Sequence, residues 1–267
     1  MTASSPTTIP RSVRVDAASP TPWSTRSELR IVHLGHTALV LADGPEHLVI
    51  TSEQFGLAPG GIQLLPADLH RLRAEMAAGS TGLSHWTPAL VDTVDLTMRA
   101  VDIDPMAVVF LGDVLRDDQH VGAFDSSRQR SAAAALVRSA QDGQPVGAAL
   151  LALIGAGPGS TPAGDDVVVG VLAGLHASGR DRAARLIERS LPGLVDRTTS
   201  SSRHYLSAAA SGRFAERVHQ LVCGLGDRTS ALEAARSASR WGATSGLDLL
   251  AGVMAAIDPS AQLRRTA

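Results

Sequence analysis

The chain has 267 residues, of which 44% are hydrophobic and 19% are charged, a composition typical of a globular protein with apolar side chains for one large core or two smaller ones. The formal net charge is −2, so the sequence predicts no basic surface for nucleic acid or for an anionic membrane. All 24 basic residues are arginine. The absence of lysine excludes Schiff-base chemistry, a pyridoxal phosphate anchor and a Walker-type nucleotide loop.

Residues 1–28 are rich in Ser, Thr and Pro and contain no apolar segment of the kind found in a secretory signal, which predicts a flexible tail. No apolar run in the chain reaches the roughly 18 residues that a membrane span needs. The single cysteine, Cys223, rules out an intrachain disulfide, and its place in a helical pattern predicts that it is buried. We therefore expect a soluble, cytoplasmic protein.

Residues 29–125 have short β-like patterns and are predicted to form a β-rich N-terminal domain. Residues 29–42 and 47–54 are expected to pair as a hairpin through the turn at 43–46. Further strands are predicted at 60–65, 95–104 and 106–114, with a polar helix around 69–78.

Residues 126–267 are predicted to form an α-helical domain. Eight helical segments follow one another, at 126–143, 144–155, 165–179, 180–191, 199–212, 213–226, 229–239 and 245–257. The fold class is therefore α+β, with a β-rich N-terminal part followed by an α-helical part that carries glycine-rich loops at helix N-termini.

The most unusual stretch is GAGPGSTPAGDD, which interrupts an apolar run between Leu153 and Leu175. Its glycines permit left-handed backbone angles and a close approach to a ligand, and its prolines stiffen the loop. Asp165 and Asp166 fall in the first turn of the following helix, where free N–H groups gather. The pattern indicates an anion site at a helix start, or a carboxylate pair that holds Mg²⁺. A glycine turn with an ordinary helix cap remains the alternative.

A second segment repeats this pattern. Residues 161–175 align with 243–257 at a constant offset, 248 − 166 = 82, which superposes Asp166 on Asp248 and Gly170 on Gly252. Stripes of Gly and Ala allow helix backbones to come close. We expect the two helices to pack side by side with their N-termini at the same end, so that Asp166 and Asp248 share one site. The alternative is that the small residues serve packing and the aspartates serve as caps.

Between these helices lies a run of five hydroxyl residues, Thr198 to Ser202, followed by Arg203. Hydroxyl donors beside an arginine can surround an oxyanion. An N-capping role explains one or two of the five equally well.

Three segments, GAGPGSTPAGDD, TTSSSRHYLSAAASGRF and GATSGLDLLAG, resemble the three signature blocks of the AllH family in the same order. In the N-terminal half, APGGIQLL (58–65) is similar to the family's Gly-Pro strand. The sequence departs from the family at Ser160, where leucine is usual, and at Ala243 and Thr244 in the third block. A named member of this family is a subunit of oxamate carbamoyltransferase in anaerobic allantoin breakdown, a branch of purine catabolism.

The resemblance implies a multi-subunit carbamoyltransferase that interconverts oxalurate plus phosphate with oxamate plus carbamoyl phosphate, alongside partner subunits related to the FdrA family. A non-catalytic ligand-binding or scaffolding subunit, and an enzyme dependent on Mg²⁺ and ATP, remain alternatives.

The expected catalytic residues are Asp165, Asp166 and Asp248. The residues expected to bind a small anion of the phosphate or carbamoyl phosphate class are Gly155, Gly157, Gly159, Ser160, Thr161, Gly164, Thr198, Thr199, Ser200, Arg203, Ser245 and Gly246. No cofactor is implied with certainty, and Mg²⁺ on Asp165 and Asp166 is the one metal site that the pattern suggests.

Overall fold

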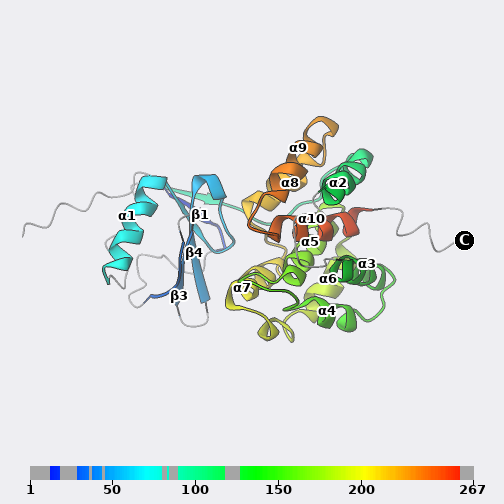
Figure 1. Cartoon of the computed structure of the whole chain (residues 1–267), viewed down its shortest axis with the longest axis horizontal. Coiled ribbons are helices and arrows are strands. Elements are labelled where there is room, and N and C mark those ends of the chain that lie inside the picture. Colours follow the sequence, from blue (N-terminus) through cyan, green and yellow to red (C-terminus); the bar gives the residue numbers. More distant parts are fainter. Residues whose placement is uncertain are drawn as a thin grey trace, which may run out of the picture. The chain divides into compact units, whose positions relative to one another are not determined.

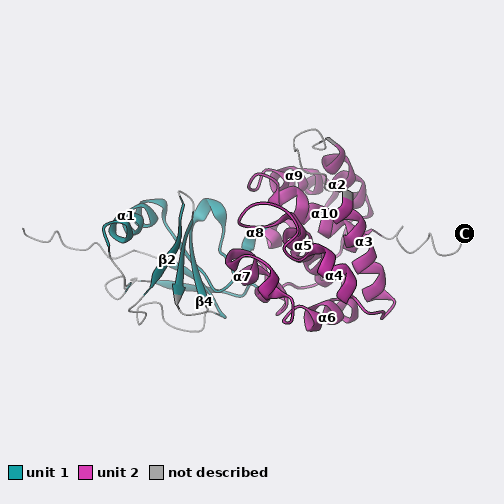
Figure 2. Ribbon diagram, turned by 60° about the horizontal axis from the view of Figure 1, so that its bottom comes forward, with its two compact units in different colours: residues 1–96, 215–217 teal, residues 97–214, 218–267 magenta. Residues whose placement is uncertain are grey.

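The computed structural model describes residues 13–18, 29–35, 38–43, 46–79, 83, 90–117 and 127–258 (Figure 1). The chain divides into two compact units (Figure 2). Unit 1 comprises residues 1–96 and 215–217, and unit 2 comprises residues 97–214 and 218–267. Unit 1 carries the sheet and unit 2 is helical, so the predicted α+β class is confirmed.

Unit 1 contains a six-stranded sheet in the order β2-β3-β4-β5-β1-β6. Its strands are β1 Val13–Asp16, β2 Arg30–Leu34, β3 Ala38–Asp43, β4 Glu46–Ser52, β5 Ile62–Leu64 and β6 Val91–Val94. Strands β2, β3 and β4 are antiparallel neighbours, β4 runs parallel to β5, β5 is antiparallel to β1, and β1 is parallel to β6. The predicted hairpin corresponds to the β3–β4 pair. Its first arm, predicted as one strand over residues 29–42, consists of two strands, β2 and β3.

Strand β1 lies within residues 1–28, which the composition predicted to be a flexible tail. Its sequence, Val-Arg-Val-Asp, alternates apolar and polar residues, and Val13 and Asp16 are both buried. The Asp16 carboxylate accepts a hydrogen bond of 2.6 Å from the N–H of Gly60. This part of the tail prediction is therefore wrong, because four residues suffice to pair with strands that lie far along the chain.

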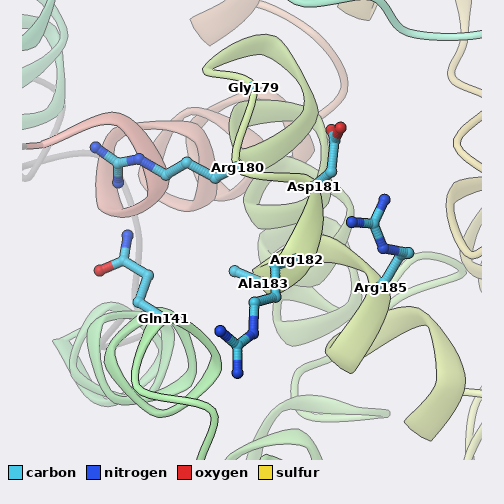
Figure 3. Close-up of a pocket in the computed structure, with 7 residues that line it drawn as sticks. All are labelled: Gln141, Gly179, Arg180, Asp181, Arg182, Ala183 and Arg185. Carbon is cyan, nitrogen blue, oxygen red and sulfur yellow. The ribbon is translucent and has the colours of Figure 1, made fainter.

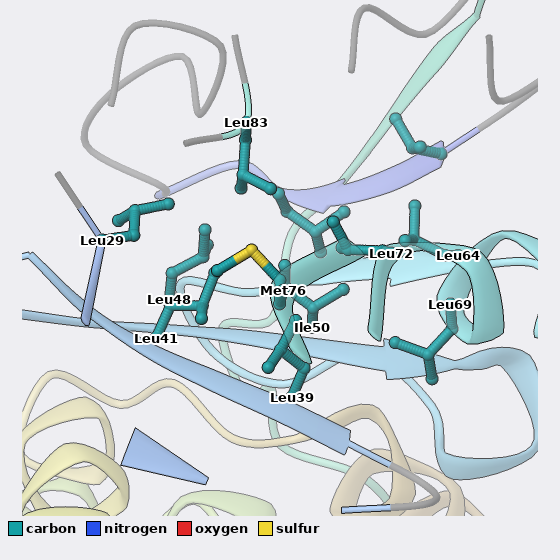
Figure 4. Packing of buried hydrophobic residues seen from close by; sticks show 12 residues of the cluster. Leu29, Leu39, Leu41, Leu48, Ile50, Leu64, Leu69, Leu72, Met76 and Leu83 are labelled. Atoms are coloured by element: carbon teal, nitrogen blue, oxygen red, sulfur yellow. The ribbon is translucent and has the colours of Figure 1, made fainter. Parts of the chain in front are cut away.

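The core of unit 1 lies between the sheet and helix α1, Pro66–Ala77 (Figure 4). Alternate residues of β3 and β4, such as Leu39, Leu41, Leu48 and Ile50, are buried as strand periodicity requires. Helix α1 covers them with buried side chains spaced three and four apart, among which Met76 lies close to Leu41 and Leu48 in the figure. This helix is the one predicted near residues 69–78.

The chain returns to unit 1 at residues 215–217, where a charged pair fixes it. The Arg14 guanidinium donates two hydrogen bonds to the Glu216 carboxylate, of 2.8 and 2.9 Å, and a third to Gln63. Glu216 also accepts from the N–H of Leu57. The units therefore divide after residue 96 and at this return, and not at residue 125, where the change in sequence character placed the boundary.

Unit 2 is built from nine described helices. They are α2 Pro105–Asp117, α3 Ser127–Gln141, α4 Gly147–Leu153, α5 Ala163–Ala177, α6 Asp181–Ser190, α7 Ser200–Ala209, α8 Glu216–Gly224, α9 Arg228–Ser239 and α10 Ser245–Ile257, of which α8 has its first two residues in unit 1. The eight helices predicted after residue 126 are confirmed as α3 to α10. Helices α5 and α10 run through the middle of the unit (Figures 1 and 2), and most of their residues are buried.

Helix α2 was predicted as a strand at residues 106–114, and that prediction is wrong. Pro105 occupies the first turn, and the Asp104 carboxylate accepts a hydrogen bond of 2.7 Å from the N–H of Met106. Buried Ala107, Leu111 and Val114 follow the spacing of a helix. The predicted strand at 95–104 is also wrong. Its described β-pairing is an isolated bridge between Thr97 and Arg213 and not a ladder of paired residues.

Two smaller findings concern membrane insertion and the cysteine. Among the described residues no helix is both long and apolar enough to cross a membrane. Cys223 lies in α8, as predicted, but it is exposed and not buried. The helix turns its Val218, Leu221 and Val222 face to the core, and residue 223 falls outside that stripe.

Candidate functional site

The glycine loop, which we define as residues 155–162, connects α4 to α5 and adopts the backbone that its composition predicts. Gly155, Gly157 and Gly159 have φ angles of 76°, 123° and 95°, all in the region that favours glycine. A Cβ at Gly155 would lie 2.6 Å from the carbonyl oxygen of Arg197, so the loop approaches the segment before α7 closely. The N–H groups of Gly157, Gly159 and Ser160 have no hydrogen-bond acceptor among the described residues. The loop therefore presents donors.

Asp165 holds this loop in place. The residue is 1% exposed, and one carboxylate oxygen accepts a hydrogen bond of 2.8 Å from the N–H of Gly155. The hydroxyl of Thr198 donates to the other oxygen. Since both oxygens bond within the chain, Asp165 joins the glycine loop to the start of the α7 segment, and its geometry is that of a positioning residue.

Helices α5 and α10 pack against each other through their backbones, as the small-residue stripes predicted. A Cβ at Gly170 would fall well inside 3.0 Å of the carbonyl oxygen of Leu249, and a Cβ at Gly252 equally close to that of Val167. The 82-residue offset relates the two contacts. Gly252 corresponds to Gly170 and Leu249 corresponds to Val167, since 252 − 170 = 249 − 167 = 82. Gly170 contacts Leu249, and Gly174, one turn later in α5, contacts Val253 and Ala256, so the helices are parallel and both N-termini lie at the same end.

The turns that lead into the two helices also repeat. Ala156 donates to the carbonyl of Leu153, as Trp241 does to that of Ala238. Gly164 and Gly246 are then bonded alike, since their N–H groups donate to the carbonyls of Ala156 and Trp241 at 2.8 and 2.9 Å. Eight residues separate the first pair and five the second, so the first turn is longer by 8 − 5 = 3 residues. The glycine loop is thus an enlarged copy of the turn before α10.

At the shared end of these helices lies an acidic pair, Asp166 and Asp248. Thr161 of the glycine loop and Ser245 of α10 are hydrogen bonded across the two helix starts, at 3.0 Å. Asp248 is 5% exposed. In each aspartate the Oδ2 atom is buried and has no hydrogen-bond partner among the described residues. Buried carboxylate oxygens without donors are costly, so this geometry calls for a donor from outside the chain or for a bound proton.

The environment of the acidic pair raises the pKa of both carboxyl groups. Burial raises the pKa of Asp166 to about 7; a hydrogen bond from Ser245 opposes this shift, and the negative charges of Asp248 and Asp165 add to it. Burial also raises the pKa of Asp248, against a hydrogen bond from Thr244 and the positive charge of Arg130. Both shifts favour the protonated carboxyl, and a pKa of about 7 leaves Asp166 near the midpoint of its titration at neutral pH.

The hydroxyl run has a largely internal role. The Thr199 hydroxyl caps α7 by accepting from the N–H of Ser202 at 3.2 Å, and it donates to the carbonyl of Ser160 at 2.6 Å. Ser200 is exposed, and the Arg203 guanidinium faces Asp196 at 3.3 Å. Neither of these two residues has a contact with the acidic pair among the described interactions.

Ser202 was not among the expected site residues. It is 2% exposed, and its Oγ atom is buried with no hydrogen-bond partner among the described residues. Its position in the first turn of α7, at i+3 from the capping Thr199, is the sequence signal that could have singled it out.

The structure thus brings most of the expected residues together. The glycine loop with Ser160, Thr161 and Gly164 meets the starts of α5 and α10, where Asp165, Asp166, Ser245, Gly246 and Asp248 lie, and Thr198 and Thr199 support it from the α7 side. Ser200 and Arg203 are placed outside this group.

The magnesium site suggested by Asp165 and Asp166 does not fit the geometry. Both oxygens of Asp165 are taken by donors of the chain. No group of three or more His, Cys, Asp or Glu side chains that could hold a metal ion is present within the described part of the chain. The residues present fit donor-bearing ligands better than a divalent cation.

A family model described as oxamate carbamoyltransferase subunit AllH matches residues 153–257, a range that contains the glycine loop, both repeated helix starts and the hydroxyl run. No curated protein and no solved structure matches the chain. Residues 153–257 therefore match the AllH family, the family that the three sequence blocks indicated.

Proposed function

We propose that this chain is a subunit of a carbamoyltransferase that acts on a small ureido or amide acid, in a reaction of the type oxalurate plus phosphate to oxamate plus carbamoyl phosphate. The observation that carries the proposal is the acidic pair, whose two Oδ2 atoms are buried and without donors where the glycine loop meets α5 and α10. The AllH match over residues 153–257 supports the substrate class.

The two sides of the site favour different ends of such a substrate. The free N–H groups of Gly157, Gly159 and Ser160 favour an oxyanion. Asp166 and Asp248 offer only acceptor oxygens when ionised, so they favour the N–H groups of an amide or ureido nitrogen. An anion between the two carboxylates would be repelled. The phosphate or carboxylate end therefore faces the glycine loop, and the amide nitrogen faces the acidic pair.

This orientation gives the acidic pair a role in proton transfer. In the proposed reaction a phosphate oxygen forms a bond to the carbamoyl carbon, and the bond from that carbon to the oxamate nitrogen breaks. The nitrogen leaves as a neutral amide only if it gains a proton, while hydrogen phosphate loses one. Asp166, as the protonated carboxyl, donates to the nitrogen, and Asp248 takes the proton of the phosphate, so the pair keeps one proton throughout.

The remaining residues position these groups. Asp165, Thr198 and Thr199 fix the glycine loop, and Gly164 and Gly246 let the two helix starts lie close to the preceding turns. Ser202 adds an unpartnered hydroxyl at the start of α7.

Arg203 favours a second interpretation, in which the chain is a non-catalytic subunit that completes the site of a partner. Its guanidinium pairs with Asp196, so the arginine that follows the hydroxyl run is already engaged by a carboxylate of the chain. An anionic substrate would then take its cationic contacts from another subunit, of the FdrA-related kind. We prefer the catalytic reading, since buried unpartnered carboxylates have no use in a scaffold.

The experiment is to purify the chain together with the proteins that bind it and to measure carbamoyl phosphate release from oxalurate and phosphate. Asp166→Asn should lower kcat by about 10²- to 10⁴-fold, the usual contribution of general acid–base catalysis, with an unchanged fold. Glu233→Gln, on the exposed face of α9, is the matched control and should leave kcat unchanged. Full activity of the Asp166 variant would refute the catalytic assignment, and an assembly that never releases carbamoyl phosphate would refute the reaction.

A further inference from the structure

A polar cavity lies at the opposite end of α5 from the acidic pair. It has a volume of about 460 Å³ and is lined by Gln141, Gly179, Arg180, Asp181, Arg182, Ala183 and Arg185 (Figure 3). Gly179 and Arg180 follow the last turn of α5, whose 15 residues span about 22 Å. The cavity is therefore separate from the glycine loop and the acidic pair, and its volume is in the range of small-molecule sites.

The polar side chains of this cavity are mostly hydrogen-bond donors. Three of them are arginines, and the amide nitrogen Nε2 of Gln141 is buried without an acceptor among the described residues. Arg182 and Arg185 have no ion-pair partner within the described part of the chain. Asp181 is the one carboxylate in the lining. A ligand that satisfies such a surface must bring acceptor oxygens.

The arginines differ in how free they are to bind. Arg180 already donates a hydrogen bond of 2.6 Å to the carbonyl of Ala256, and burial lowers the pKa of its guanidinium, against the charge of Asp258. In Figure 3 the side chains of Arg180 and Arg182 lie on either side of Gln141, whereas Arg185 lies on the Asp181 side of the view, farther from Gln141. Arg182 is the guanidinium best placed for a ligand that also reaches Gln141, and Arg185 adds positive charge from the side.

We propose that this cavity binds a small organic oxyanion, with a phosphate or carboxylate group held between Arg182, Gln141 and Arg180. This site is independent of the acidic pair and of the proposed carbamoyl transfer. Guanidinium groups hold both kinds of oxyanion through two parallel N–H donors, so the chemistry of the ligand group is the same for either source.

The test is to titrate the full chain with three probes, inorganic phosphate, adenosine monophosphate and citrate. Calorimetry measures the affinity of each probe. Arg182→Gln should weaken binding of the preferred probe by tenfold or more, the loss expected for one charge-assisted hydrogen-bond pair. Arg189→Gln removes the same charge from an exposed position on the same helix outside the cavity, and should leave the affinity within twofold. The relative affinities of the probes identify phosphate, organic phosphate or carboxylate as the bound group.

Three results would overturn the proposal: no probe binds at millimolar concentration, the Arg182 and Arg189 variants weaken binding equally, or the binding is lost in Asp166→Asn. The last variant also separates the two sites. It should lower kcat for carbamoyl transfer by about 10²- to 10⁴-fold and leave Arg182-dependent binding intact, so either proposal can fail alone.

Discussion

Replacing Asp166 by asparagine removes the acid whose pKa the fold raises furthest, and it should change the pH dependence of stability. Burial raises the pKa of Asp166 from 3.8 to about 7, so between these values the folded chain binds a proton that the unfolded chain releases. Stability from this group is complete below about pH 4 and is lost as the pH rises through about 7. Asparagine carries no proton to lose, so the variant should lack this slope.

The magnitude follows from the shift. At 1.36 kcal/mol per pKa unit, moving from 3.8 to about 7 costs the folded state about 4 kcal/mol once Asp166 is ionised. Most of this develops within an accessible range, about 2.5 kcal/mol between pH 5 and pH 8 by the linkage relation. Relative to the unsubstituted chain, Asp166→Asn should thus gain about 2.5 kcal/mol of unfolding free energy over that range. The loss of repulsion on Asp248 acts in the same direction.

The assay is urea unfolding of both proteins at several pH values from 5 to 8, with Glu233→Gln as an exposed control that should show no pH-dependent difference. A constant difference between the unsubstituted chain and Asp166→Asn across this range would show that Asp166 is ionised in the folded state as it is in the unfolded one. The raised pKa of Asp166, and with it the proposed acid role, would then be wrong. A variant that is more stable at pH 8 yet inactive would mark Asp166 as a functional residue kept at the expense of stability.

Two further changes test the packing of the site. Gly252→Ala would place a Cβ against the carbonyl of Val167, so it should separate α5 from α10 and destabilise the chain by about 3 kcal/mol; an unchanged Tm would contradict the backbone contact. Asp165→Ala leaves two partly buried donors without an acceptor and should cost about 2 to 5 kcal/mol, while the amide of Gly155 exchanges hydrogen faster. Hydrogen exchange by mass spectrometry checks this, and unaltered protection of the Gly155 and Ala156 amides would argue against the positioning role.

Local sequence patterns were sufficient to predict most of the helices after residue 126. The Gly and Ala stripes of residues 161–175 and 243–257 predicted two parallel helices in close contact, because only small residues let backbones approach. Local pattern failed at residues 106–114, where the β-branched and aromatic residues of MAVVFLGDV predict a strand. The Asp104–Pro105 pair, which caps and opens α2, was the better signal.

The candidate site was likewise predictable only in part. The sequence predicted which residues gather at the helix starts, but it did not distinguish Asp165 from Asp166. One step along a helix turns a side chain by about 100°, which places Asp165 against Gly155 and Thr198 and leaves Asp166 beside Ser245 and Asp248.

Local spacing and residue type were thus enough to predict the α+β class, the helices after residue 126, the glycine loop and the 82-residue repeat. The tertiary structure decided which donors meet which carboxylates, that β1 joins the sheet, and that residues 215–217 return to unit 1 through Arg14 and Glu216. These depend on partners up to 202 positions away along the chain, and local periodicity carries no information about such pairs.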